Sequence, residues 1–150
     1  QAREAEQQLV ILEGRLERTL RSARAHRLRG DVLFRERRNE AALAAYENGK
    51  EFYYSKRGQL NFSCADCHVG NSGMMIRADK LSPALGHPTH FPVYRSKWND
   101  MGTLHRRFDG CNKQVRAAPL PAQGEEYRNL EYFLTYMSNG MEVNGPGARK

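Results

Sequence analysis

Hydrophobic positions recur at helical spacing in three segments of the chain, and two of these lie in its N-terminal half. Residues 3–29 carry a leucine stripe among Arg and Glu residues, and Gly30 breaks the pattern. A second helix is predicted from Asn39, as its N-cap, to about residue 56, with Gly58 as its stop. The apolar stripes of the two helices are Leu9, Leu12, Leu16 and Leu20, and Ala42, Tyr46, Gly49 and Phe52.

The third helical pattern covers residues 125–139 and ends at Gly140. Its first turn holds two glutamates, and its apolar face consists of Tyr127, Leu130, Leu134 and Met137. Residues 69–124 are rich in Gly, Pro, Asn and Ser, which favours loops with short helices, one of them near residues 96–107. No period-2 alternation of strand length occurs, so the pattern predicts an all-α fold. A loop region this long is tolerable in a compact domain only if it wraps around something.

The apolar content is low for a chain of this length. The 150 residues suffice for one domain of ordinary size, yet only 39% are hydrophobic and the mean hydropathy is −0.78. A bound group that fills part of the interior would supplement so thin a core. No run approaches the about 20 apolar residues that a membrane helix needs. No signal peptide is visible, and the chain begins at Gln1 rather than Met.

The chain is basic, with a formal net charge of +7 and a pI of about 9.6. Such a charge first suggests nucleic acid, but the aromatic and basic interleaving of the common RNA-binding modules is missing. The positive charge gathers in residues 15–38 and 95–128. We therefore expect small anions or an acidic protein surface as partners.

The stretch that runs from Cys64 through Cys67 to His68 has the Cys-x-x-Cys-His spacing by which c-type haem is attached. The two thiols reach the two vinyl groups of the porphyrin, and the histidine comes under the iron as a ligand. A thioredoxin-like redox pair would need a βαβ setting, and a zinc site would need a second pair of ligands at short spacing. A plain structural disulfide would not need His68. The motif therefore predicts one covalently attached haem c.

A haem held by His68 needs a second axial ligand, and the residues alone leave this choice open. The candidates are Met74, Met75, Met101, Met137, Met141, His87, His90, His105 and Cys111. Cys111 is the odd cysteine of three, which in an exported protein indicates a reactive thiol or a bond outside the chain. The cations that surround it in sequence are Arg106, Arg107, Lys113 and Arg116. They would favour its thiolate, whereas the plain alternative is an inert cysteine beside a solvated charge run.

Several separated segments together resemble the haem domain of the SoxA family, the catalytic subunits of the SoxAX cytochromes of bacterial sulfur oxidation. The similarity covers residues 40–150, and its segments are RGQLNFSCADCH, GHPTHFPVYRSKW, GTLHRRFDGC, VRAAPLP, EEYRNLEYFLTYMSNG and GPGARK. It implies haem attachment at Cys64 and Cys67, with His68 as the proximal ligand. Cys111 would be the distal ligand and the active-site cysteine, able to carry an extra sulfur as a persulfide.

The resemblance also implies an activity and its partners. In the family, thiosulfate is joined through sulfur to a cysteine of the carrier protein SoxY, and two electrons leave through haem, partly by way of the small cytochrome SoxX. Arg107 matches the family's active-site arginine, while Lys113 and Arg116 are weaker correspondences. An arginine-rich pocket would concentrate and orient a small dianion such as thiosulfate. Covalent haem and a SoxY-type partner both imply the bacterial periplasm.

The N-terminal part departs from the family pattern, in which many members carry an additional cytochrome-like domain. Here no second attachment motif precedes Cys64. We expect a class I cytochrome c-like haem domain at residues 39–150 and an N-terminal helical extension, or the remnant of a preceding domain, at residues 1–38. The chain is then a single-haem form or a fragment. Two other functions stay open: an electron carrier with an unreactive Cys111, and a thiosulfate dehydrogenase that forms tetrathionate without a carrier.

Overall fold

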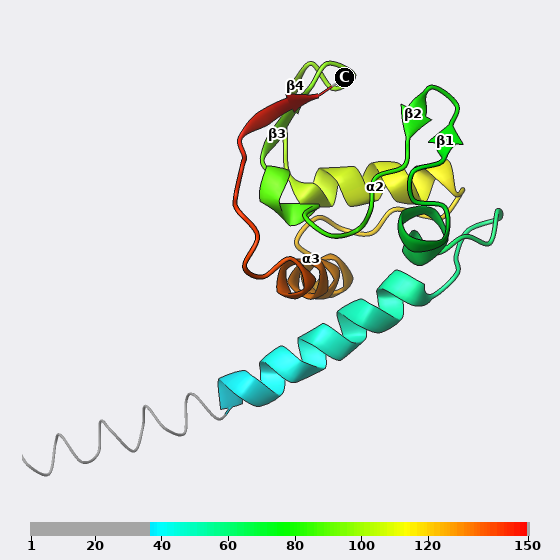
Figure 1. The fold of residues 1–150 in the computed structure, drawn as a ribbon. Helices are drawn as coiled ribbons and strands as arrows, with labels where there is room; N and C mark the ends of the chain where they lie inside the picture. Colours follow the sequence, from blue (N-terminus) through cyan, green and yellow to red (C-terminus); the bar gives the residue numbers. More distant parts are fainter. Residues whose placement is uncertain (1–36, 150) are drawn as a thin grey trace, which may run out of the picture. The chain divides into compact units, whose positions relative to one another are not determined.

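The structure, a computed structural model, describes residues 37–149, so the helix expected over residues 3–29 lies outside the described part. Residues from Leu43 onward belong to one compact unit. The α-helices named below are the one through residues 37–54, α2 (Leu104–Gln114) and α3 (Glu125–Met137), all visible in Figure 1. None of the described helices is both long and apolar enough to cross a membrane.

The helices expected over residues 39–56 and 125–139 are both present, with ends that differ by about two residues from the prediction. The chain is already helical at residue 37, so Asn39 lies inside the first helix, and its prediction as N-cap was wrong. α3 begins after Gly124 and has two glutamates in its first turn, where the helix dipole favours negative charge.

A close backbone approach joins the helix through residues 37–54 to α3. A Cβ atom at Gly49 would lie 2.6 Å from the carbonyl carbon of Asn129 and 2.8 Å from Cβ of Phe133, so only glycine allows this crossing. On the same face, the ring of Tyr46 packs against the ring of Phe133 with centroids 5.2 Å apart. The apolar stripe predicted for this helix is therefore its packing face.

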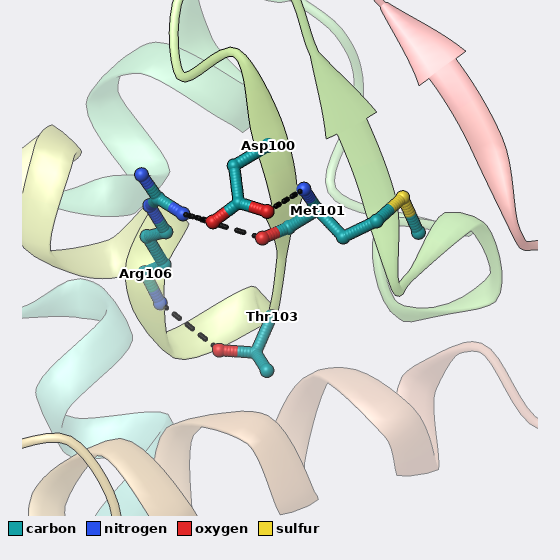
Figure 2. A network of polar contacts seen from close by, with 4 residues as sticks. All are labelled: Asp100, Met101, Thr103 and Arg106. Atoms are coloured by element: carbon teal, nitrogen blue, oxygen red, sulfur yellow. Dashed lines mark hydrogen bonds and ion pairs between the residues drawn. The ribbon is translucent and has the colours of Figure 1, made fainter.

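α2 is the helix expected near residues 96–107, but it starts later and continues further along the chain. The hydroxyl of Thr103 caps it by accepting a hydrogen bond from the backbone N–H of Arg106 at 3.3 Å. The Arg106 guanidinium in turn donates to the carboxylate of Asp100 at 3.0 Å, as Figure 2 shows. Because residues 100–102 are taken up in a strand, the helix cannot begin before Thr103.

Two small sheets lie in the region that was expected to be loop. The strands are β1 (Met75–Ile76), β2 (Asp79–Lys80), β3 (Val93–Arg95), β4 (Asp100–Gly102) and β5 (Gly147–Arg149). β1 and β2 form an antiparallel pair, while β3 lies between β4, to which it is antiparallel, and β5, to which it is parallel. The all-α expectation is thus not confirmed. Strands of two or three residues are too short to show a period-2 pattern in the sequence.

The hydrophobic core is small and centres on α3. Its buried members are Tyr53, Ala84, Leu104, Phe108, Tyr127, Leu130, Phe133 and Leu134. α3 contacts α2 and also the 3₁₀ turn η2 (Pro88–His90). The buried hydroxyl of Tyr127 accepts hydrogen bonds from the Asn112 side chain at 2.8 Å and from the backbone N–H of Leu120 at 3.2 Å. These bonds tie the loop after α2 to α3 and fix one wall of the cavity described below.

Candidate functional site

The residues of the Cys-x-x-Cys-His motif lie on a short helical turn that ends in the π-helical segment η1 (Asp66–Gly70). A reciprocal cap starts this turn. The backbone N–H of Ser63 donates to the Asp66 carboxylate at 2.8 Å, and the backbone N–H of Asp66 donates to the Ser63 hydroxyl at 3.0 Å. The turn brings Cys64, Cys67 and His68 to the lining of one cavity.

The ring of His68 is held in the form that a metal ligand needs. Its Nδ1 lies 2.7 Å from the backbone carbonyl oxygen of Ser82, which can only accept, so Nδ1 carries the proton and Nε2 keeps a free lone pair. Burial lowers the pKa of His68; the hydrogen bond to Ser82 acts against this lowering, and the nearby Arg107 adds to it. The imidazole is therefore neutral at neutral pH.

The three cysteines are free, half-buried and close to one another. Burial raises the pKa of the Cys64 thiol to about 11, and the Arg57 guanidinium, whose Nη1 lies 3.9 Å from Sγ, opposes this rise. Burial and then the neighbouring Cys111 raise the pKa of Cys67. Cys111 influences both other thiols, so the three sulfur atoms share one neighbourhood. Among residues 37–149 no group of three His, Cys, Asp or Glu side chains is placed to hold a metal ion.

The cavity has a volume of about 370 Å³, within the range of about 300–1,000 Å³ that ligand pockets occupy. Much of its wall is apolar and includes Phe52, Tyr53, Phe91, Leu104, Phe108 and Leu130. A larger hollow of about 530 Å³ lies beside η2 and the C-terminal end of α3, but no cysteine, histidine or arginine of the described residues lines it. The chemistry-bearing groups therefore gather in the first cavity.

Of the nine candidates for the second iron ligand, three line this cavity: His87, His90 and Cys111. The ring of His87 touches the ring of His68 edge to face, with centroids 4.5 Å apart, which leaves no room for a porphyrin between them. Nδ1 of His90 is bonded to the side-chain oxygen of Asn144. This bond leaves Nε2 of His90 available, as at His68, so the geometry keeps two candidates, His90 and Cys111 in the last turn of α2.

His105 is a buried structural residue rather than a candidate ligand. It is only 2% exposed, and its Nδ1 accepts a hydrogen bond from the backbone N–H of Gln123 at 3.0 Å. Its Nε2 lies 2.9 Å from the carboxylate of Glu131 on α3. The sequence does not show that His105 is fully buried while His87 and His90 line the cavity. The burial of His105 depends on which face of α2 packs against α3. The candidate methionines likewise do not line the cavity.

Among the four cations flanking Cys111 in sequence, only Arg107 lines the cavity. Arg106 is turned toward Asp100 and the Trp98 ring, whose centroid is 4.8 Å from its guanidinium carbon. Lys113 pairs with Asp109 at 2.7 Å on the exposed side of α2, and Arg116 is not part of the lining. Residues adjacent in a helical sequence point in different directions, so a charge run around Cys111 overstates the charge that faces it.

Arg57, described above beside Cys64, also lines the cavity, and so do two arginines of the three-stranded sheet that the sequence analysis did not single out, Arg95 on β3 and Arg149 on β5. The latter two lie more than 50 positions apart and meet only because β3 and β5 pair in parallel, with these two residues in register. The segments that contain them were noted in the sequence, but no signal there reveals that pairing.

Comparison with known proteins shows the family of the chain. The family profile described as SoxA/TsdA, cytochrome c domain, matches residues 48–143, which include the attachment motif, Arg107 and Cys111. The chain belongs to this family. The prediction of a cytochrome c domain is thereby confirmed, and such a domain implies haem c.

The SoxA/TsdA chain has relatives that carry the name L-cysteine S-thiosulfotransferase subunit SoxA. It is 71% identical over 109 residues to the one from Allochromatium vinosum, covering 73% of this chain and 39% of the relative. It is 57% identical over 122 residues to the one from Chlorobaculum thiosulfatiphilum, covering 81% and 43%. A crystal structure of SoxXA from P. pantotrophus superposes with a TM-score of 0.67 at 42% identity, covering 71% of this chain and 40% of that one. The chain thus spans about two fifths of the length of these relatives.

The residues present fit a c-type haem. The cavity is concave and largely apolar, two free thiols line it three positions apart, and the adjacent histidine presents a neutral nitrogen because Ser82 holds the other one. Cys111 supplies a further sulfur to the same cavity.

Proposed function

We propose that this chain is the haem domain of an L-cysteine S-thiosulfotransferase, which couples thiosulfate to a cysteine of a SoxY-type carrier protein. One haem c is held through thioethers at Cys64 and Cys67, with His68 as one iron ligand and Cys111 as the other. Residues 39–150 form this domain, and residues 1–38 are an N-terminal extension or the remnant of a preceding domain. The names of the relatives and the gathering of these side chains in one cavity support the proposal.

The reaction forms one sulfur–sulfur bond and removes two electrons. The terminal sulfur of thiosulfate becomes bonded to the sulfur of the carrier cysteine, the carrier S–H bond breaks, and one proton and two electrons are released. When bound, the haem supplies an acceptor for electrons close to the sulfur chemistry. A partner cytochrome of the SoxX type then takes the electrons onward, which is consistent with the SoxXA title of the similar crystal structure.

The chain's own residues divide the remaining work. Arg107 binds the sulfonate end of thiosulfate, since a guanidinium fork matches the oxygens of such a group. Cys111, carried as a persulfide, would bond through its outer sulfur to the terminal sulfur of thiosulfate in the step that gives up two electrons; the carrier thiol would then take over the whole S–SO₃ unit, lose its proton and release the Cys111 persulfide as leaving group. Ser82 keeps the proton of His68 on Nδ1, so that Nε2 stays available to the iron. We place the protein in the periplasm, because covalent haem and a SoxY-type carrier belong there.

The observation that carries the proposal is that Cys111 and Arg107 line the same cavity as Cys64, Cys67 and His68. The test is a transfer assay with haem-loaded full chain, partner cytochrome and carrier, followed by mass spectrometry of the carrier. Cys111→Ala should retain covalent haem and transfer no thiosulfate. Full transfer by Cys111→Ala would leave an electron carrier with an inert cysteine. Accumulation of tetrathionate with an unmodified carrier would indicate a thiosulfate dehydrogenase instead.

A further inference from the structure

The cavity has a cationic wall, which Arg95 and Arg149 form on the side of the three-stranded sheet. β3 and β5 run in parallel, and Arg95 and Arg149 are register partners at the ends of these strands, as the neighbouring strands in Figure 1 illustrate. Register partners on adjacent strands project to the same side of a sheet. Both side chains line the cavity, so the two guanidinium groups add to the positive charge that Arg107 brings to it, and Arg95 is close enough to Cys111 to interact with it electrostatically.

The electrostatics of this wall call for an anion. Arg95 is half-buried, and its pKa is lowered by burial and by the charges of Arg107 and Arg149, while Asp79 and Cys111 act against this lowering. Asp79 is the only carboxylate among the described residues that line the cavity, against five Arg or Lys side chains. Arg149 is exposed and the Arg95 guanidinium also lies over the Trp98 ring, so the repulsion is partly relieved already; an anion that enters between the arginines relieves it further.

The position of Cys111 among the neighbours of Arg95 indicates which anion this is. A group bound between Arg95 and Arg107 lies beside the sulfur that reacts, so the wall suits the oxygens of the sulfur donor. We propose that Arg95 and Arg149 form, with Arg107, a binding site for the sulfonate group, which makes the enzyme prefer donors that carry –SO₃⁻ over hydrosulfide. This inference rests on the proposed function for the identity of the donor. The carboxylates of the haem propionates are the other oxyanions that could occupy the wall.

Equilibrium binding tests the site apart from turnover. Thiosulfate is titrated by calorimetry into haem-loaded full chain in a Cys111→Ala background, which prevents chemistry at sulfur. Arg95→Gln and Arg149→Gln should each weaken thiosulfate binding about tenfold or more, as expected for loss of a hydrogen bond to a charged group. Arg95→Lys should restore only part of the affinity, because an ammonium cannot make the bidentate contact. Lys97→Gln is the matched control: it removes one charge from an exposed residue two positions away that does not line the cavity, and affinity should hold.

Steady-state kinetics with Cys111 intact give a second measurement. The same variants should raise KM for thiosulfate about tenfold or more and leave the use of hydrosulfide unchanged. Unchanged thiosulfate affinity in Arg95→Gln and Arg149→Gln would overturn the inference. It would also be overturned if these variants lost haem while the molecules that keep haem bound thiosulfate with normal affinity. The wall would then bind the haem propionates. The proposed function can fail separately. If these variants bind thiosulfate more weakly but the intact chain leaves the carrier protein unmodified in the transfer assay, the anion site is supported and the transferase reaction is refuted.

Discussion

The crossing at Gly49 allows a prediction whose sign depends on the structure alone. Replacing a glycine inside a helix by alanine normally stabilises the helix by about 0.8–1.0 kcal/mol, because alanine has the higher helix propensity. At Gly49 the added methyl group would lie 2.6 Å from the backbone carbonyl carbon of Asn129 and closer still to its oxygen. Backbone atoms cannot rotate away, so the two helices must separate.

Such overpacking typically costs about 1–3 kcal/mol, and a backbone clash belongs at the upper end of that range. After subtracting the propensity gain, we expect Gly49→Ala to lower the free energy of unfolding by about 2 kcal/mol. Gly110 in α2 is the matched control, because a Cβ atom there meets nothing within 4 Å. Gly110→Ala should raise stability by about 0.5–1 kcal/mol, so that one substitution has opposite signs in two helices.

The assay is urea-induced unfolding of the haem-loaded chain, with the free energy obtained by linear extrapolation. Tyr53, Leu130 and Leu134 belong to the two crossing helices and line the cavity, so Gly49→Ala should also weaken haem packing and broaden the haem absorption bands. Equal stabilisation by Gly49→Ala and Gly110→Ala would refute the close crossing, and with it the proposed wall of the cavity.

Three further predictions concern the site. Arg107→Ala should lower kcat/KM for thiosulfate about 10- to 100-fold in steady-state assays, whereas Arg106→Ala, which loses a contact outside the cavity, should change it less than about twofold. Ser63→Ala removes half of the reciprocal cap and should cost about 1 kcal/mol in urea unfolding; an unchanged midpoint would argue against the capped turn. Hydrogen bonds from Ser63 hold the pKa of Asp66 below its usual value, so the folded chain binds fewer protons than the unfolded one, and stability should fall as the pH drops below about 4. Asp66→Asn should flatten that part of the pH profile, and a profile that stays as steep as in the wild type would contradict this assignment.

The parts of the site that the sequence predicted are those that lie close together along the chain. Cys64, Cys67 and His68 are recognisable because one helical turn joins them, and the chemistry fixes their spacing. Arg107 and Cys111 are four positions apart, which brings both to one side of α2. The helical stripes were equally visible, since their period is local, and they led to the crossing at Gly49.

The parts that the sequence could not predict depend on contacts between distant segments. Arg95 and Arg149 become neighbours only through the parallel pairing of two three-residue strands. Arg106 and Lys113 were grouped with Arg107, but the partners that draw them away from the cavity, Asp100 and Asp109, can be assigned only once the helix faces are known. The burial of His105 against α3 is a fact of packing in the same way.

Mass spectrometry of the intact chain before and after incubation with thiosulfate tests the central claim most directly. The account predicts one haem that survives denaturation, attached at Cys64 and Cys67, and one added sulfur that maps to Cys111, disappears on reduction and is absent from Cys111→Ala. A chain that loses its haem on denaturation, or that gains the same sulfur mass when Cys111 has been replaced, would contradict it.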